Sequence, residues 1–243
     1  MANQKGGVAK TTTVAALAAA LAEVGRKVLV VDLDPQASLT FSLGFEPDDL
    51  DPTVHDALLG RADLDDTVLR VDEGFDLVPS NIDLAGAEAH LLTRTGREYA
   101  LQHLLEEIAD RYDAVFVDCP PSLGVLTINA LTAADRVLVP LQCETLSHRG
   151  VGQLLATIDD VRRLTNRRLL VAGLLPTMFD GRTRHAREVL EAVGERYDVT
   201  VLGPIPKSIR FAEAPASGRT ILSTARRHPG AEAYRSLARE LVA

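Results

Sequence analysis

A glycine-containing loop that runs directly into an alanine-rich helical segment is the feature that most limits how this chain can fold. Residues 3–12 read Asn-Gln-Lys-Gly-Gly-Val-Ala-Lys-Thr-Thr, and a helix is predicted over Lys10–Glu23. Glycines let several backbone N–H groups point inward at an anion, and the helix dipole adds positive potential. The strict phosphate-loop pattern GxxxxGK[ST] is not met, because Gln4 and Ala9 occupy its glycine positions. Taken alone, the loop is either a phosphate cradle or a glycine turn that caps a helix.

Short apolar, β-branched runs alternate with helical segments along the rest of the chain. Strands are predicted at Lys27–Asp32, Phe75–Pro79, Ala114–Asp118, Arg136–Pro140, Leu169–Leu175 and Val199–Gly203. Further helices are predicted at Glu98–Arg111, Leu126–Ala134, Val151–Leu164, Arg184–Arg196 and Gly230–Val242. Such alternation predicts an α/β fold with a doubly wound, mostly parallel sheet. We expect one domain over residues 1–243, with the acidic stretch Glu46–Asp66 as a solvated excursion.

Carboxylates follow two of the predicted strands. Asp32 and Asp34 stand at the end of one strand, and Asp118 ends another. The carboxyl ends of parallel strands are where ligands sit, and an acid there can hold a Mg²⁺-bound water or orient an attacking water. One strand-end aspartate is equally well a turn former. Together with the loop, these residues predict a nucleotide site.

Composition excludes several other classes. No uninterrupted apolar stretch approaches ~18 residues, so no transmembrane helix is expected. Cys119 and Cys143 form no CxxC pair, which argues against zinc and disulfide frameworks and favours a reducing cytosol. The net charge of −8 is unevenly distributed, because residues 1–120 hold 9 basic and 22 acidic side chains whereas residues 121–243 hold 17 and 12. The basic second half therefore permits a local basic patch.

Four motifs in order resemble one family over essentially the whole chain. Lys5–Thr12 resembles the deviant Walker A loop of ParA/MinD ATPases, with its additional lysine, and Asp32–Gln36 resembles switch I of the ParA/Soj branch. Asp118–Ser122, followed by Asn129–Leu131, is similar to the Walker B and switch II region. Arg210–Gly218 is similar to a late R-x-x-E-A-P segment of the family. The resemblance implies a P-loop NTPase with ATP and Mg²⁺ as cofactors.

The resemblance also implies roles for individual residues. Lys10 would contact the β- and γ-phosphates, Asp34 would orient the hydrolytic water, and Lys5 would reach the partner's ATP across a nucleotide-sandwiched dimer. Metal-binding residues would be Thr11, Asp32 and Asp118. Nucleotide-binding residues would be Lys5, Gly6, Gly7, Val8, Ala9, Lys10, Thr11, Thr12, Thr177, Met178, Pro206 and Lys207.

The function implied by the resemblance is chromosome or plasmid partition by a cytoplasmic, nucleoid-associated ATPase. Such a protein forms a homodimer with ATP, binds DNA without sequence preference and is stimulated by a ParB-like centromere-binding protein. Arg210 matches a family position implicated in DNA binding, and Arg182, Arg184 and Arg187 are second candidates. No aromatic residues interleave with these arginines, so phosphate contact is the expected mode.

Alternatives remain open. A MinD-like membrane protein is disfavoured, because the tail over Glu232–Ala243 mixes charges and reads as a packed helix rather than a membrane anchor. A nucleotide-gated DNA-binding or scaffold protein that does not hydrolyse ATP, and a ParA-like ATPase that positions another cargo, both fit the motifs.

Two departures from the family pattern carry structural expectations. Ala9 replaces a glycine, and we expect its φ to be negative so that its methyl group is tolerated. The family's first strand precedes the loop, where only Met1-Ala2-Asn3 stand, so the first strand is expected to be truncated or to begin upstream. We expect Lys27–Asp32 and Ala114–Asp118 to flank the partly empty slot.

Overall fold

Strands at the centre of the molecule fall into two groups separated by the N-terminus. The computed structural model describes residues 1–143, 147–182 and 184–242, without the side chains of residues 147–149 and 184–187. One sheet has the order β2-β3-β1-β4, formed by Leu69–Arg70, Asp76–Val78, Val28–Asp32 and Ala114–Asp118. The other pairs β5 (Arg136–Gln142) with β6 (Leu170–Thr177). All pairings are parallel except that of β2 with β3.

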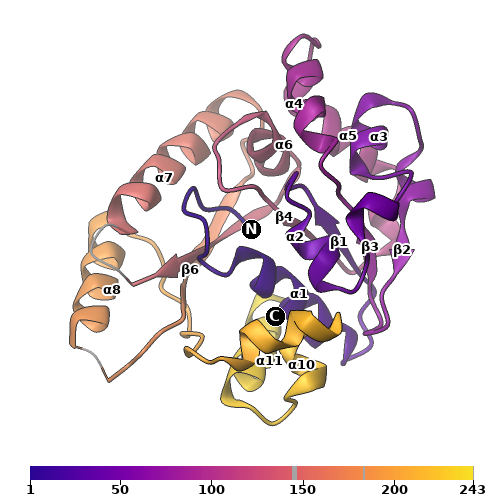
Figure 1. Ribbon diagram of the computed structural model, residues 1–243. Helices are drawn as coiled ribbons and strands as arrows, with labels where there is room; N and C mark the ends of the chain where they lie inside the picture. The colour runs from indigo at the N-terminus through magenta and orange to yellow at the C-terminus, as the bar shows by residue number, and fades with distance from the viewer. Residues whose placement is uncertain (144–146, 183, 243) are drawn as a thin grey trace.

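Helices cover both faces of the sheets, as Figure 1 shows. The α-helices are α1 (Lys10–Ala22), α2 (Ser38–Ser42), α3 (Val54–Leu59), α4 (Leu84–Leu92), α5 (Ala100–Glu106), α6 (Val125–Ala133), α7 (Ser147–Leu164), α8 (Arg184–Tyr197), α9 (Arg210–Glu213), α10 (Ile221–Thr224) and α11 (Pro229–Val242). Short 3-10 turns are η1 (Pro47–Asp49), η2 (Leu64–Thr67), η3 (Arg97–Tyr99), η4 (Ala109–Arg111) and η5 (Ala214–Ser217). Among the helices described, none is long and apolar enough to cross a membrane. The α/β fold with a mostly parallel sheet is confirmed.

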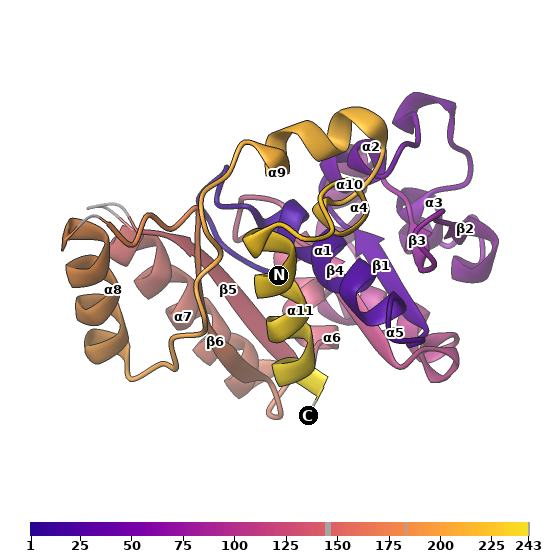
Figure 2. The same ribbon diagram turned by 90° about the horizontal axis from the view of Figure 1, so that it is seen from below.

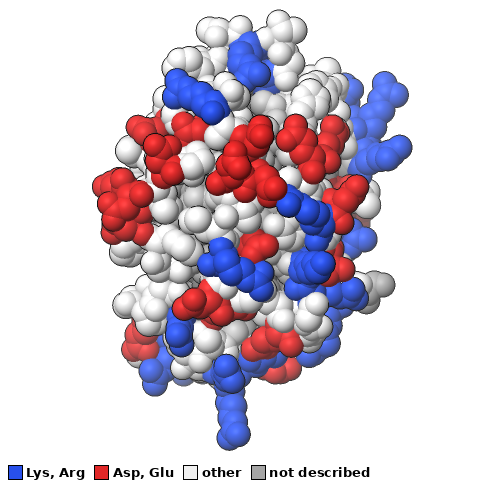
Figure 3. All heavy atoms as spheres, turned by 90° about the vertical axis from the view of Figure 1, so that its right-hand side faces the viewer, with Lys and Arg blue, Asp and Glu red and all other residues white. Residues whose placement is uncertain are grey.

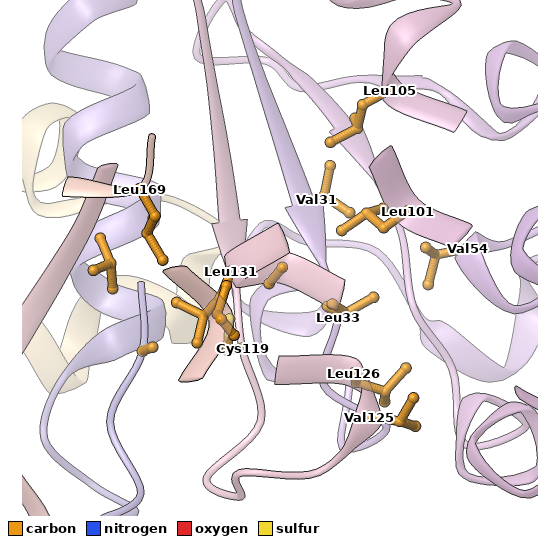
Figure 4. Close-up of a cluster of buried hydrophobic side chains, with 14 of the residues drawn as sticks. Val31, Leu33, Val54, Leu101, Leu105, Cys119, Val125, Leu126, Leu131 and Leu169 are labelled. Carbon is orange, nitrogen blue, oxygen red and sulfur yellow. The ribbon is translucent and has the colours of Figure 1, made fainter. Parts of the chain in front are cut away.

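Two apolar cores lie on opposite faces of the sheet. One contains side chains from α3 to α7, and Figure 4 shows part of it, with Val31 and Leu33 near Leu101 and Leu105 of α5. The other packs α1 against β1, α10 and α11. Every residue of β1 is buried, because a strand covered on both faces has no solvent side. Because helices pack on both faces, β1 and β4 are held in place and their carboxyl ends lie at the same edge of the sheet.

The N-terminal residues lie between β4 and β5, where a strand is missing. Cys119 donates its backbone N–H to the Met1 carbonyl over 3.3 Å, and Ala2 donates to the Leu138 carbonyl over 3.3 Å. Below these bonds the two strands enclose a cavity of about 650 Å³, lined by Val115, Val117 and Leu138 among others. Figure 2 shows the N-terminus between the strand pairs. Met1 and Ala2 therefore bridge β4 and β5 without forming a strand.

The strands that flank this gap differ from the expected ones. β1 pairs directly with β4, from Val28 opposite Ala114 to Asp32 opposite Asp118, so the slot does not lie between these two strands. The prediction was wrong because apolar runs identify strands but not their spatial order, which long-range pairing decides.

Several predicted elements also differ in extent. Residues 98–111 form three short pieces, η3, α5 and η4, in place of one helix. Val199–Gly203 contributes only an isolated bridge from Val201 to Leu174. The stretch Glu46–Asp66 is not a purely solvated excursion, because it contains η1, α3 and most of η2 and buries Val54 and Leu64 in the core. α4 and the short helices were not predicted, since their apolar patterns span too few turns to show a period.

Candidate nucleotide site

The loop before α1 turns through two residues with left-handed backbone. Gly7 has a φ of 73° and Ala9 a φ of 63°. The expectation of a negative φ at Ala9 was wrong, because Ala9 is the N-cap of α1 and the tight entry into the helix needs this conformation. A non-glycine residue there costs roughly 1 kcal/mol. The loop therefore keeps the glycine-type turn even where the glycine itself is absent.

Lys10, the first residue of α1, points its side chain back under the loop. Its side chain is buried, with 7% of the residue exposed, and its Nζ donates to the Lys5 carbonyl oxygen over 3.2 Å. Burial lowers the pKa of Lys10, while the charge of Asp118 opposes that shift. A cation held at the helix N-terminus inside a curled loop is placed to neutralise an anion bound there.

Thr11 and Asp118 join the loop to the end of β4. The Thr11 hydroxyl donates to Asp118 Oδ2 over 2.6 Å, across 107 residues of sequence. The other carboxylate oxygen, Oδ1, is buried and has no hydrogen-bond partner. Burial raises the pKa of Asp118 to about 6, partly offset by the Thr11 bond. An orphaned carboxylate oxygen beside a hydroxyl is an oxygen donor set of the kind that Mg²⁺ and its waters take.

Asp32 lies opposite Asp118 in the β1–β4 ladder and is wholly buried. Burial, followed by the nearby Asp118 charge, raises the pKa of Asp32 to about 7. Asp34, two residues on, is only partly buried and accepts a bond from the Gln36 backbone N–H over 3.0 Å. The three carboxylates thus gather at one sheet edge, with Asp34 nearest to solvent.

Two residues that sequence reasoning missed hold these carboxylates in place. Thr40 of α2 donates its backbone N–H and its hydroxyl to Asp32 Oδ2 over 2.9 and 2.8 Å. Ser80 donates its backbone N–H to the Thr40 hydroxyl and its own hydroxyl to the Asp34 carbonyl. Ser80 follows β3 at the same sheet edge, so the strand-end rule that identified the aspartates also points to it. Thr40 lies inside a helix and carries no such signal.

The protein offers no dense cluster of metal ligands. Within residues 1–143, 147–182 and 184–242, no group of three or more His, Cys, Asp or Glu side chains is placed to hold a metal ion. Mg²⁺ at this site would therefore take most of its ligands from phosphates and waters, as it does in nucleotide enzymes. Thr11 and Asp118 would supply the direct protein contribution, with Asp32 behind them.

The segments expected near the base and ribose do lie together beside the loop. The Thr177 hydroxyl donates to the Val8 carbonyl over 3.0 Å, and Met178 follows with a φ of 49°. Phe179 forms a bridge with Pro206, and Lys207 donates its backbone N–H to the Phe179 carbonyl. These contacts place Thr177 against the loop and hold the segments around Met178 and Pro206 beside each other.

The outer part of the loop is open to solvent. Gln4, Lys5, Gly6 and Gly7 are all exposed, and Thr12 is half-buried at the start of α1. Lys5 is held by its backbone, whose N–H donates to the Asn3 side chain over 2.9 Å. Lys5 therefore lies in the solvent-exposed outer part of the loop.

The candidate DNA-contacting arginines differ in exposure and in their ion pairs. Arg210 opens α9, with 58% of its side chain exposed, and pairs with Glu213 over 2.9 Å. Arg182 is 91% exposed and makes two bonds to Asp180. The side chains of Arg184 and Arg187 lie outside the described residues. Figure 3 shows the side that carries α3 and β2, where groups of acidic side chains lie among lysines and arginines.

Comparisons with known proteins match most or all of the chain. A family model described as an AAA domain matches residues 1–171. The chain is 44% identical to the sporulation initiation inhibitor protein Soj of Bacillus subtilis, covering 99% of this chain and 96% of Soj. It is 41% identical to the chromosome partitioning protein ParA of Myxococcus xanthus, covering all of this chain and 86% of that one. Among solved structures, a Mycobacterium smegmatis protein titled cobyrinic acid a,c-diamide synthase, with bound ADP and magnesium, superposes with a TM-score of 0.90 at 55% identity, covering 99% and 91% of the two chains.

Proposed function

This chain belongs to the ParA/Soj family of P-loop ATPases, and on that premise we propose that it is a Mg²⁺-dependent ATPase that partitions chromosomes or plasmids. ATP and Mg²⁺ are its cofactors, as the magnesium–nucleotide complexes of a 55% identical structure support. The proposal rests most directly on the Thr11–Asp118 bond, which joins the helix-start hydroxyl to a strand-end carboxylate with one orphaned oxygen.

Each residue of the site has a separable task in this proposal. Lys10 neutralises phosphate charge from beneath the loop, where its ammonium group is already held by the Lys5 carbonyl. Asp34 orients the attacking water, because it is the carboxylate of the three that solvent reaches. When bound, Mg²⁺ supplies the electrostatic stabilisation of developing phosphate charge. Thr177, Met178, Pro206 and Lys207 flank the base and ribose.

Lys5 acts between two subunits. Its exposure at the outer loop supports a role in which Lys5 of the partner subunit contacts the nucleotide of the first, as an arginine finger does. Lys5→Ala should then bind ATP as a monomer and fail to dimerise in sedimentation with ATP. Lys27→Ala, at an exposed lysine remote from the loop, should dimerise normally. A stable ATP-bound dimer of Lys5→Ala would remove this role.

DNA binding follows dimerisation in the proposal. One monomer of this protein, whose net charge is −8, offers too few positive charges for firm DNA binding, and an ATP-joined dimer doubles the patch. The dimer would bind nucleoid DNA through Arg210 and Arg182, with Arg184 and Arg187 as further candidates, and a ParB-like partner would stimulate ATP turnover.

Fluorescence anisotropy with labelled DNA of arbitrary sequence tests this. We expect binding with ATP but not with ADP, weakening with salt at a log–log slope of roughly −0.9 per phosphate neutralised. Arg210→Ala should weaken binding to all sequences and flatten that slope. Arg239→Ala is the matched control, because Arg239 is similarly exposed and pairs with Glu232. Equal affinity with and without ATP, or unchanged binding by Arg210→Ala, contradicts the proposal.

A second candidate function is ATP-driven amide formation, favoured by the name of the 55% identical structure. Burial raises the pKa of both Cys119 and Cys143 to about 11, so neither provides the activated thiolate that would release ammonia from glutamine. Steady-state ATP turnover distinguishes the two functions: stimulation by cobyrinic acid with ammonia supports amidation, and stimulation by DNA with a ParB-like protein supports partition. Two further alternatives are an ATPase that positions another cargo and a protein that binds ATP without hydrolysing it. Either would show ATP-dependent DNA binding without stimulation of ATP turnover by a ParB-like protein.

A further inference from the structure

Two glycines far apart in the sequence pack backbone against backbone beside the site. Gly44 follows α2 with a φ of 91°, and Gly218 follows η5 with a φ of 64°. A Cβ atom at Gly218 would lie 2.7 Å from the Gly44 Cα, and one at Gly44 would lie 3.3 Å from the Gly218 Cα. Both positions therefore require glycine for two reasons: the positive φ disfavours a side chain, and the neighbouring backbone leaves no space for one. No secondary-structure requirement explains why two surface loops approach this closely.

On one side of this contact, α2 is tied to the carboxylates of the nucleotide site. Thr40 donates two bonds to Asp32, and Ser80 links Thr40 to the Asp34 carbonyl. α2 is only five residues long, so Thr40 and Gly44 lie about one helical turn apart. α2 therefore connects the Asp32 carboxylate, through Thr40, to the backbone at Gly44.

On the other side, Gly218 ends a continuous helical rod that begins at Arg210. α9 runs into η5 without a break, and Gly218 donates its N–H to the Pro215 carbonyl over 3.0 Å. Beyond the contact, Glu73 accepts bonds from both the N–H and the hydroxyl of Thr220 at 2.9 and 3.0 Å. Because Glu73 holds Thr220 in place, a displacement of Gly218 would move α9 and η5 rather than α10.

A cavity beneath the contact leaves room for this movement. It has a volume of about 250 Å³ and lies between α1, α2, η5 and α10, lined by Thr12, Phe41, Phe211 and Pro215 among others. Figure 2 shows α2, α9 and α10 together at this edge of the molecule.

We infer that the Gly44–Gly218 contact couples the nucleotide site to the segment that carries Arg210. When nucleotide binding shifts Asp32 and Asp34, the position of Arg210 shifts with them. This inference rests on the proposed function. It assigns α2, Gly44 and Gly218 a positioning role that neither the phosphate loop nor the strand-end motif implies.

Gly218→Ala tests the coupling, with Gly60→Ala as a matched control. Gly60 has a φ of 71°, and a Cβ there would meet nothing within 4 Å, so it carries the same backbone strain without the contact. Hydrogen exchange of residues 208–220 is measured with and without MgATP, together with ATP affinity and DNA binding. We expect wild type and Gly60→Ala to change exchange on ATP binding. Gly218→Ala should bind ATP within about threefold of wild type, show no such change, and lose at least tenfold of its ATP-stimulated DNA affinity.

A second pair of variants guards against misfolding of Gly218→Ala. Thr40→Val removes the hydroxyl bonds to Asp32 and Ser80 at nearly constant volume, and Thr40→Ser keeps them. Thr40→Val should uncouple exchange in residues 208–220 from ATP, and Thr40→Ser should restore it. If wild type itself shows no ATP-dependent DNA binding, the proposed function fails. If wild type binds DNA with ATP and both Gly218→Ala and Thr40→Val still respond fully, the coupling fails.

Discussion

The two ends of the gap between β4 and β5 are built in opposite ways. At the carboxyl end, Met1–Asn3 bridge the strands, and the Asn3 side chain donates to the Pro140 carbonyl over 2.6 Å. At the amino end the same strands enclose a cavity of about 650 Å³ lined by Val115 and Leu138. The ligand end is therefore held by directed bonds, whereas the other end leaves backbone groups of two sheet edges without ladder partners. Changes at the first end should alter nucleotide chemistry, and changes at the second should alter stability.

The largest effect is expected at Lys10. Lys10→Ala removes the only described lysine that is buried in the loop, and two or more charge-assisted bonds of about 1.5–3 kcal/mol each are lost. ATP affinity in calorimetry should fall by at least ~100-fold. Lys27→Ala, in the same lysine-poor chain, should bind normally. Retained affinity in Lys10→Ala would show that the bonded end is not the nucleotide site.

Asp34→Ala should separate hydrolysis from binding. The water loses its orienting carboxylate, so single-turnover hydrolysis should slow by roughly 100-fold while ATP affinity stays within about threefold. Gln36→Ala serves as the control, because Gln36 is exposed and contributes only its backbone N–H to Asp34. A parallel loss of ATP affinity would mean that Asp34 holds the nucleotide rather than the water.

Filling the cavity end should raise stability without changing nucleotide binding. An extension of ~6–8 apolar residues ahead of Met1 can pair with both sheet edges, and each net hydrogen bond contributes roughly 0.5–1.5 kcal/mol. We expect a rise of about 5–10 °C in the thermal unfolding midpoint. A glycine-serine extension of equal length is the control, since it offers no apolar surface to the cavity. Equal midpoints for the two extended chains would contradict the unpaired-edge interpretation.

The smallest effect is expected from Ala9→Gly. Glycine relieves the left-handed strain at a φ of 63°, but it also gains entropy in the unfolded chain. The net gain in the free energy of unfolding should be about 0.5 kcal/mol by denaturant titration. Ala37→Gly, at a second left-handed alanine that caps α2, should give a similar gain. Destabilisation at Ala9 alone would show that its methyl group supports the loop.

The residue types of the loop and of the strand ends were identifiable from local sequence signatures. Lys10, Thr11 and Asp118 were identifiable because a helix start and a parallel strand end each have a local signature, and the fold brings such ends to one edge. The apolar runs that became β1 and β4 were equally local, since burial on both faces selects continuous apolar stretches.

Which of these segments contact one another depends on long-range packing, which no local signature reports. The gap lies between β4 and β5, and Thr40 reaches Asp32, because strand order and helix placement depend on contacts between distant residues. The left-handed φ of Ala9 was likewise set by the entry into α1, against the preference of alanine. Gly44 and Gly218 are a further example. Each is an ordinary loop glycine in the sequence, and the need for glycine at both positions follows from the close approach of the two backbones.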